Sequence, residues 1–362
     1  MAFGKRKEEQ KAPAIVVAAP TTDVEKFRRL FALGKMLDIK HETTNSLMRL
    51  GAKNIVRIPS ISTKLPTLDY DVIQTGGIPR GRVVEIFGPE SAGKTTLTLW
   101  VIAQAQSQGD IAAFVDAAHA IDLGYAHNLG VNVDDLVLNQ PDSGEKALQV
   151  VEALVDSQCV GLIVVDDVAS LVPEAELNGE IGDVHMGLQA RLMSQAMRKL
   201  TAKCARNKVT VIFINQIREK IGVMYGSPET TPGGRALKFY SSIRLDVRRK
   251  DEIKQGTTLV GHTLRLKAVK NKVGTPLRET LVDLYYPGTA YPCGFDYIGD
   301  LITHASKQGL FETSGSWYSL DGERIANGLA NLKSALRQNT KVLDILRKKI
   351  DDLSGEDNAV KV

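Results

Sequence analysis

The segment from Gly88 to Thr96 constrains the fold of this chain more than any other. Its sequence, GPESAGKTT, fills every position of the pattern G-x-x-x-x-G-K-[ST]. The apolar run 83–87 before it predicts a buried strand, and residues 97–105 after it predict a helix. A strand, a glycine-rich turn and a helix N-terminus together place backbone N–H groups around a phosphate chain. The alternative is a chance glycine turn before a helix.

The motif predicts a nucleoside triphosphate site and assigns roles within it. The Lys94 side chain is expected to reach the β- and γ-phosphates, and the Thr95 hydroxyl is expected to ligate Mg²⁺. The predicted cofactor-binding segment comprises Gly88, Pro89, Glu90, Ser91, Ala92, Gly93, Lys94, Thr95 and Thr96.

Strand and helix patterns alternate after this segment. Strands are predicted at 111–116, 136–139, 161–167 and 210–216, and a helix is predicted to open near Asp142 with a D-x-x-E cap at Glu145. Apolar and charged residues alternate at 243–247 and 263–269, which predicts antiparallel additions to the sheet edge. The chain is therefore expected to be an α/β protein whose mostly parallel central sheet is covered on both faces, with its ligand at the carboxyl ends of the strands.

The length of 362 residues favours a principal domain with smaller attachments. We expect a flexible tail (1–22), a helical segment (23–56), a nucleotide-binding core (57–292), a small C-terminal domain (293–350) and a flexible tail (351–362). Apolar spacing in 24–37 predicts a helix that packs either on its own domain or on a neighbouring subunit. The C-terminal domain is expected to hold short helices, a turn at Trp317-Tyr318 and a charged helix from Thr340 to Asp352.

Composition excludes several other classes of protein. The formal charge of +4 is too small to indicate nucleic-acid binding by itself. Cys159, Cys204 and Cys293 are widely spaced, so they predict neither a zinc site nor a disulfide framework, and they favour a reducing cytoplasm. The longest N-terminal apolar run, 14–20, is too short for a membrane span and does not resemble a signal sequence. A cytoplasmic location is expected.

Polar residues end two of the predicted central strands. Asp166 follows an apolar run, where a carboxylate holds Mg²⁺ beside a phosphate loop; the alternative is an N-cap for the next helix. Asn215 and Gln216 end the other strand, a suitable place for an amide that senses the γ-phosphate.

Two glycine-containing loops follow these strands, at 178–187 and 216–234. The helix after the first loop places Arg191, Gln195 and Arg198 on one face. The second loop spans nineteen residues without clear periodicity, which exceeds the usual length of a connection. Basic, hydroxyl and glycine backbone groups with interleaved apolar tips suit a nucleic-acid backbone with wedges between bases. A lid over the nucleotide is the alternative.

Longer segments resemble the RecA family of homologous-recombination proteins. The resemblance covers about residues 24–350 and rests on GPESAGKTT, FVDAAHAID, LIVVDDVASL, EIGDVHMGLQARLMSQAMRKL, FINQIREKIGVMYGSPETTPGGRALKFY and VKNK. It implies a RecA-like P-loop ATPase core with an N-terminal helical oligomerisation segment and a small α/β C-terminal domain. It also implies a DNA-dependent ATPase that uses ATP and Mg²⁺, assembles into helical filaments on single-stranded DNA, pairs it with homologous double-stranded DNA and exchanges strands.

The resemblance also assigns residues, position by position. For the nucleotide it implies adenine contacts by Asp122 and Tyr125, stacking by Tyr286, a metal-side carboxylate at Asp166, and coupling of the γ-phosphate to the second loop by Gln216. For DNA it implies wedges at Met186 and Ile221, and a backbone lining of Arg191, Ser194, Arg198, Arg218, Gly233, Gly234 and Arg235. Lys270 and Lys272 would reach a neighbour's ATP across the subunit interface, with Phe239 carrying part of the coupling, and the helix at 24–37 would dock on the adjacent protomer.

One departure from the family bears on catalysis. The family's catalytic glutamate, which polarises the attacking water, falls on Ala118, and a methyl group can neither accept a proton nor orient water. Asp116 and Glu90 are the nearby carboxylates, and neither is expected to substitute well. The sequence therefore predicts a chain that binds ATP and assembles on DNA but hydrolyses ATP slowly. Smaller departures are Asp167, Pro232 and Arg235.

Two other functions remain open from the sequence. A ring-forming motor of the helicase type uses the same core and trans-acting cations, although a match to both DNA loops is not expected of it. A non-hydrolysing protein that merely coats single-stranded DNA is compatible with Ala118. His119 and His185 are expected to be structural.

Overall fold

The computed structural model describes residues 24–41, 58–180, 183, 185, 187–219 and 228–357. The chain divides into two compact units, 1–56 and 57–362. Within the first unit, α1 (Val24–His41) is a helix of 18 residues. Its apolar side chains include Met36 and Ile39, which are 68% and 83% exposed. The predicted tail at 1–22 lies outside the described residues.

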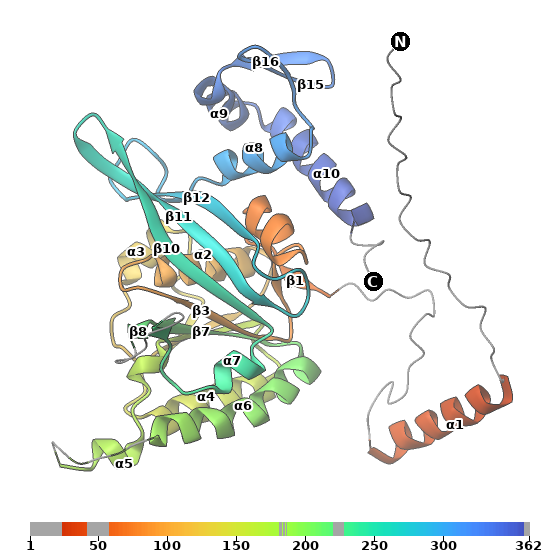
Figure 1. The fold of residues 1–362 in the computed structure, drawn as a ribbon, viewed down its shortest axis with the longest axis vertical. Coiled ribbons are helices and arrows are strands. Elements are labelled where there is room, and N and C mark those ends of the chain that lie inside the picture. The colour runs from red at the N-terminus through yellow and green to blue at the C-terminus, as the bar shows by residue number, and fades with distance from the viewer. Residues whose placement is uncertain are drawn as a thin grey trace, which may run out of the picture. The chain divides into compact units, whose positions relative to one another are not determined.

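A nine-stranded sheet forms the centre of the larger unit (Figure 1). Its order is β13-β12-β11-β10-β3-β7-β6-β4-β5. The strands are β3 (Val83–Gly88), β4 (Ala112–Asp116), β5 (Leu136–Asn139), β6 (Leu162–Asp166), β7 (Thr210–Gln216), β10 (Ile243–Gln255), β11 (Thr258–Asn271), β12 (Glu279–Tyr285) and β13 (Gly294–Phe295). From β10 to β5 all pairs are parallel, which confirms the predicted mostly parallel sheet.

The prediction for the sheet edge was wrong on one side of β10. Ile243–Asp246 pair in parallel with β3, and only the other edge of β10 pairs antiparallel with β11. The alternation arises because Ile243, Leu245 and Val247 pack in the core, while Arg244 and Asp246 between them form ion pairs with Glu85 and Arg248. Beyond this stretch β10 and β11 run on as a long hairpin, in which the residues around the tip are exposed (Figure 1). The segment at 263–269 is antiparallel on both sides, as predicted.

Alternate side chains of the central strands feed two separate cores, as expected for a sheet covered on both faces. One core contains Val84, Ile86 and Phe114, and the other contains Val83, Val115 and Phe213. The π-helix η1 (Thr67–Ile73), α2 (Lys94–Ser107) and α3 (Leu123–Asn128) cover the first; α4 (Gly144–Ser157), α6 (Leu188–Asn207) and α7 (Ala236–Tyr240) cover the second. The short elements are β1 (Ser60–Ile61), β2 (Ile78–Pro79), η2 (Val168–Ser170), α5 (Glu174–Leu177), β8 (Arg218–Glu219) and β9 (Glu229–Thr230).

The predicted cap of α4 was displaced by one residue. The helix begins at Gly144, and the Ser143 hydroxyl accepts a hydrogen bond from the Lys146 backbone N–H. Asp142 instead pairs with the Lys146 ammonium at 2.9 Å, and Glu145 accepts from the backbone N–H of Glu174. Both carboxylates therefore have partners other than the one that a D-x-x-E cap would give them.

The C-terminal region packs around its own core, formed by α8 (Tyr297–Lys307), α9 (Leu329–Gln338), α10 (Thr340–Asp357) and a three-stranded sheet. The sheet consists of β14 (Glu312–Ser314), β15 (Trp317–Leu320) and β16 (Glu323–Asn327). Two expectations were wrong here. Trp317 and Tyr318 begin a strand rather than a turn, and α10 continues to Asp357, so residues 351–357 are helical rather than a flexible tail.

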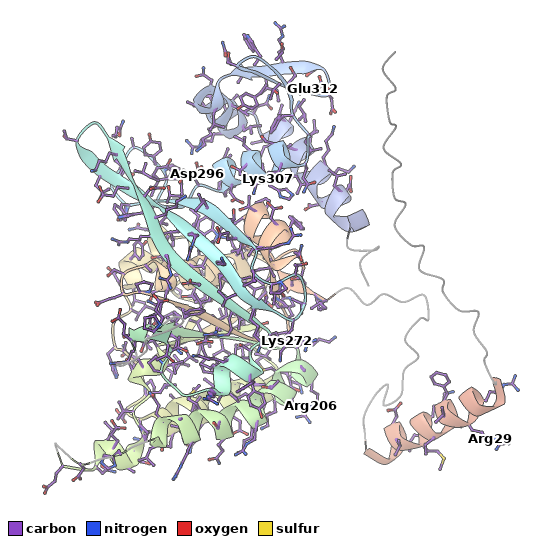
Figure 2. All side chains as sticks on the ribbon, in the orientation of Figure 1. Arg29, Arg206, Lys272, Asp296, Lys307 and Glu312 are labelled. Carbon is purple, nitrogen blue, oxygen red and sulfur yellow. The ribbon has the colours of Figure 1, made fainter. Side chains whose placement is uncertain are left out.

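Buried polar contacts join this region to η1. Thr67 donates its backbone N–H (2.9 Å) and its hydroxyl to the Asp300 carboxylate. Asp71 bonds the His304 ring at 2.9 Å and the Lys307 ammonium at 3.1 Å, the latter among the side chains labelled in Figure 2. Among the described residues, no helix combines the length and apolar character that a membrane span requires.

Candidate nucleotide and DNA site

The phosphate loop closes tightly between β3 and α2. A Cβ on Gly88 would lie 2.1 Å from the Val247 carbonyl oxygen, and Gly93 adopts φ +92° directly before α2, so both positions require glycine. No side chain caps α2, which leaves its first N–H groups facing the loop. The Lys94 ammonium folds back onto the carbonyls of Pro89 (2.6 Å) and Gly88 (3.1 Å). Its pKa is lowered by burial.

Carboxylates converge next to this loop at the end of β6. The Thr95 hydroxyl donates to Asp166 Oδ2 at 2.6 Å, which brings the two predicted metal ligands together. Burial, together with the neighbouring charges of Asp167 and Asp116, raises the pKa of Asp166 to about 6. A hydroxyl and a carboxylate under this repulsion fit Mg²⁺, which keeps several waters and phosphate oxygens as ligands. Within the described residues, no cluster of three His, Cys, Asp or Glu side chains forms a metal site by itself.

A cavity of about 370 Å³ extends from the phosphate loop toward a group of rings. Its lining includes Ser91 to Thr96, Tyr125, Arg249, His262, Leu264, Leu284 and Tyr286. The Tyr125 hydroxyl lies 3.2 Å from that of Thr96, and the Tyr286 hydroxyl bonds the His262 ring. The structure thus brings both predicted tyrosines to one end of the cavity. Asp122 is not part of the lining, since it caps α3 and accepts from the Tyr125 backbone N–H.

Sequence reasoning missed four residues of this cavity, Arg249, His262, Leu264 and Leu284, of which His262 and Arg249 have polar side chains. Both lie on the β10–β11 hairpin, far along the chain from the phosphate loop. Burial and the charge of Arg249 lower the pKa of His262, so its ring is neutral at pH 7. No local motif marks them, because only the pairing of β10 with β3 carries the hairpin to the cavity.

At the position where the resemblance predicts a catalytic glutamate, the chain has the methyl group of Ala118. The Ala118 backbone N–H donates to the Asp166 carbonyl at 3.2 Å. Asp116 is buried, and its carboxylate accepts from the N–H groups of Ala120 (3.0 Å) and Ile121 (3.3 Å) and from the Gln140 amide (3.0 Å). Glu90 is exposed on the phosphate loop.

The ends of β6 and β7 are joined by side-chain hydrogen bonds. The Gln216 amide donates to Asp167 Oδ2, while Asp167 Oδ1 accepts from the Ser170 N–H (2.9 Å) and hydroxyl (2.8 Å). The Asn215 amide donates to Glu85 (3.0 Å) and to the Pro232 carbonyl (3.2 Å), so β7 also holds the end of the second loop.

The predicted DNA residues lie on α6 and on the flanks of the second loop. Arg191 and Arg198 are exposed on α6, and Arg218 on β8 and Arg235 before α7 are exposed as well. Ser194 is half-buried and donates its hydroxyl to the Ala190 carbonyl of its own helix. Gly233 and Gly234 both have positive φ, +80° and +73°. The two predicted wedges, Met186 and Ile221, lie outside the described residues.

Lys270, Lys272 and Phe239 form a compact group at the end of α7. Both ammonium groups donate to the Phe239 carbonyl, at 2.9 Å and 3.0 Å, and Figure 2 labels Lys272 at this place. The Phe239 ring is 67% exposed. Burial, with the charges of Lys272 and Arg244, lowers the pKa of Lys270 to about 8. None of the three lines the cavity of the same chain.

Comparisons with known proteins identify the family of this chain. A family model described as the RecA N-terminal domain matches residues 33–290, and one described as the RecA C-terminal domain matches residues 299–355. Protein RecA from Listeria seeligeri is 50% identical over 316 residues, which cover 87% of this chain and 89% of its own length. Protein RecA from Listeria ivanovii is 51% identical over 305 residues, covering 84% of this chain and 86% of its own length.

Among solved structures, the crystal structure of the RadB recombinase is 20% identical, covers 62% of this chain and 96% of that chain, and has a TM-score of 0.48. The identification rests on the family models and on the relatives at half identity. The chain belongs to the RecA family, whose members are DNA-dependent ATPases of homologous recombination.

Proposed function

We propose that this chain binds ATP with Mg²⁺, assembles into a helical filament on single-stranded DNA, and pairs that strand with a homologous duplex for exchange. The proposal rests on the hydrogen bonds that join the phosphate loop to the ends of β6 and β7, the strands that lead toward the two predicted DNA loops. Thr95 bonds Asp166, the next residue Asp167 bonds Gln216, and Gln216 opens the second loop.

The described side chains suggest how nucleotide and DNA are held. The N–H groups at the start of α2 and the Lys94 ammonium would bind the phosphates, and Tyr125 and Tyr286 would flank the base. Mg²⁺, when bound by Thr95 and Asp166, supplies charge neutralisation at the β- and γ-phosphate oxygens. The exposed Arg191, Arg198 and Arg218 would contact DNA phosphates, while Lys270 and Lys272 would reach the nucleotide of an adjacent subunit.

We infer that ATP turnover is slow. The residue expected to orient the attacking water is replaced by Ala118, and the buried Asp116 carboxylate is already engaged by three donors. A chain that holds ATP without cleaving it would keep its filament in the ATP-bound form. Such a filament would still exchange strands, because pairing would need both DNA loops but no ATP turnover. A protein that merely coats DNA would not exchange strands.

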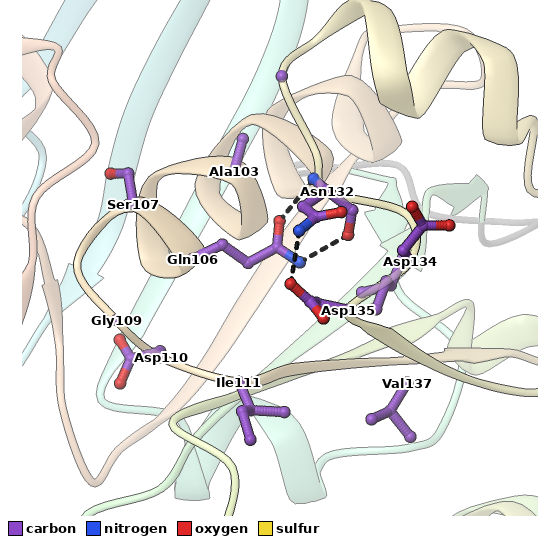
Figure 3. A pocket seen from close by; sticks show the side chains of 12 residues that line it. Ala103, Gln106, Ser107, Gly109, Asp110, Ile111, Asn132, Asp134, Asp135 and Val137 are labelled. Atoms are coloured by element: carbon purple, nitrogen blue, oxygen red, sulfur yellow. Dashed lines mark hydrogen bonds between the residues drawn. The ribbon is translucent and has the colours of Figure 1, made fainter.

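Self-association is supported by complementary surfaces on α1 and beside β5. The α1 sequence carries five Lys and Arg residues against two Asp and Glu residues, together with exposed apolar side chains. A groove between the end of α2 and the sheet edge β5 contains Asp110, Asp134 and Asp135 beside the exposed Ile111 and Val137 (Figure 3). We propose that α1 of one copy occupies this groove of the next copy.

Two hydrogen bonds between the Gln106 side chain and the Asn132 backbone fix one side of the groove. The Gln106 side chain both donates to the Asn132 carbonyl and accepts from its N–H, each at 2.9 Å, as the dashed lines in Figure 3 show. Because α1 of one copy and the groove of another are different surfaces, the contact is heterologous and links copy to copy into an open filament or a closed ring, not into a symmetric pair. A cytoplasmic location accords with three free cysteines.

The variant Lys94→Ala tests the proposed function. Fluorescence anisotropy of labelled single-stranded DNA would be measured with and without a non-hydrolysable ATP analogue, and filaments would be viewed by electron microscopy. The analogue should tighten DNA binding by the parent chain and not by Lys94→Ala, with a loss of roughly tenfold or more. Lys146→Ala, which removes an exposed ammonium on α4, is the control. Unchanged filament growth by Lys94→Ala, or rings in place of filaments, would contradict the proposal.

A further inference from the structure

Three segments of the chain meet next to Asp166 and Asp167, the carboxylates at the end of β6. The turn η2 follows Asp167 at the end of β6, α6 begins directly after the first loop, and residues 232–234 end the second loop. The three segments are η2, the start of α6 and the end of the second loop, and each lies within a few residues of the nucleotide site or of one of the two loops.

The side chain of Gln189, on α6, forms hydrogen bonds with the other two segments, η2 and the end of the second loop. Its amide N–H₂ donates to the carbonyls of Val168 in η2 (2.9 Å) and of Leu171, the residue directly after η2 (3.2 Å). Its carbonyl oxygen accepts from the backbone N–H of Gly233 at 3.2 Å. Gln189 is half-buried and lies in the first turn of α6. Both ends of one amide are thus occupied by backbone groups that have different positions in the chain.

The packing around this amide leaves little free space. A Cβ added to Gly233 would lie 2.9 Å from Val168 Cγ1, and one added to Gly234 would lie 2.8 Å from Ala190 Cβ. The second loop therefore touches both η2 and α6 through bare backbone. Since close-packed contacts transmit displacement, a shift of η2 moves the second loop and the start of α6 together.

Hydrogen bonds connect η2 in turn to the nucleotide site. Val168 is the next residue after Asp167, whose carboxylate holds the Gln216 amide, and Asp166 before it holds the Thr95 hydroxyl. A separate bond from Asn215 to the Pro232 carbonyl joins β7 to the second loop without passing through α6. The hydrogen bonds of Gln189 connect α6, the helix that follows the first loop, to both η2 and the second loop.

We propose that Gln189 is a positioning residue that couples the nucleotide state at Asp166 and Asp167 to both DNA loops at once. Gln189 touches neither nucleotide nor DNA in this arrangement. It fixes the second loop against α6, so that both loops respond to one movement of η2. The inference rests on the proposed function, because it concerns nucleotide-dependent DNA binding.

The test is the ratio of two dissociation constants for labelled oligothymidylate, without nucleotide and with a non-hydrolysable ATP analogue. In Gln189→Leu the ratio should fall roughly tenfold relative to the parent chain, while affinity for a fluorescent ATP analogue stays within about twofold. Gln189→Glu is the second variant. This variant keeps the acceptor for Gly233 but cannot donate to the carbonyls of Val168 and Leu171, so its ratio should fall as well. Because Glu has the same shape as Gln, this variant still tests the inference if Gln189→Leu does not fold.

Asn207→Leu is the matched control. Asn207 ends the same helix, is half-buried, and donates its side-chain amide to a backbone carbonyl, that of Val155, at 2.8 Å. Its ratio should equal that of the parent chain. Equal weakening of DNA binding in both nucleotide states would indicate a merely structural role and would overturn the inference, as would an unchanged ratio in both Gln189 variants. A parent ratio near one would instead overturn the proposed function itself, and with it this inference.

Discussion

Ala118 is the residue with the largest expected effect on chemistry, because the resemblance to the RecA family predicts a catalytic glutamate at this position. Ala118→Glu should raise DNA-stimulated phosphate release by roughly a hundredfold, the range that a positioned general base supplies. Phosphate release would be measured with and without single-stranded DNA. Ala120→Glu, on the same exposed turn, is the control and should leave the rate unchanged. Equal rates for the parent chain and Ala118→Glu would show that turnover does not depend on this position.

Asp167 adds a negative charge where a triphosphate is expected to bind. It acts on Lys94 and raises the pKa of Asp166, so it opposes binding of an anion at this site. Asp167→Asn removes the charge and leaves one acceptor oxygen, which can keep either the Ser170 bonds or the Gln216 bond but not both. Affinity for a fluorescent ATP analogue should rise roughly threefold to tenfold. The surface variant Asp142→Asn should have no effect, and weaker binding by Asp167→Asn would contradict this electrostatic account.

Some site residues could be predicted from the sequence and others could not. Lys94 and Thr95 follow from a motif whose geometry is local, because nine consecutive residues form the whole loop. Asp166 and Gln216 follow from the rule that parallel strands present their carboxyl ends at one edge. His262 and Gln189 could not be predicted, since the first reaches the cavity through a hairpin and the second acts through backbone groups in two distant segments.

At the scale of elements, the sequence predicts buried strands well and their partners less well. The run at 210–216 coincides with β7, because a continuous apolar run reports burial on both faces. The run at 136–139 coincides with β5, although Val137 and Leu138 are exposed on this edge strand. The parallel pairing of β10 with β3 could not be read from its alternating pattern, which reflects one covered face and not strand direction. The small sheet of the C-terminal region was missed because its strands have only three to five residues.

The contact of η1 with α8 should depend on pH through Asp300. Burial raises the pKa of this carboxyl group from 3.8 to about 6, above its value in the unfolded chain. The folded chain therefore holds a proton that the unfolded chain has lost, and stability falls as pH rises from about 4 to about 6. Asp300→Asn removes this titration, so its melting temperature should change less than that of the parent chain between about pH 4.5 and pH 7.

The expected difference in this contribution is on the order of 2 kcal/mol across the window. Thermal unfolding of both proteins at the two pH values would measure it. Glu312→Gln is the control, because Glu312 is an exposed carboxylate of the same region, labelled in Figure 2. An identical pH dependence for the parent chain and Asp300→Asn would show that the carboxyl group titrates normally.

At the scale of the whole molecule, a filament requires that each chain offer two different surfaces. The proposed pair is α1, with its exposed apolar side chains and positive charge, and the acidic groove beside β5. An unpaired sheet edge such as β5 also presents backbone groups that a second chain can contact. Neither surface lines the nucleotide cavity of its own chain, so substitutions there leave Lys94, Thr95 and Asp166 of that chain in place.

The double variant Met36→Asp/Ile39→Asp should weaken self-association roughly tenfold or more, because it places charges on apolar side chains that the contact would bury. Val137→Lys on β5 should do the same from the other side of the contact. Sedimentation velocity with an ATP analogue and no DNA would measure the loss. Ile345→Asp on α10, with 47% of its side chain exposed, is the matched control. If the α1 and β5 variants sediment like the parent chain while Ile345→Asp does not, the C-terminal region and not α1 joins the subunits.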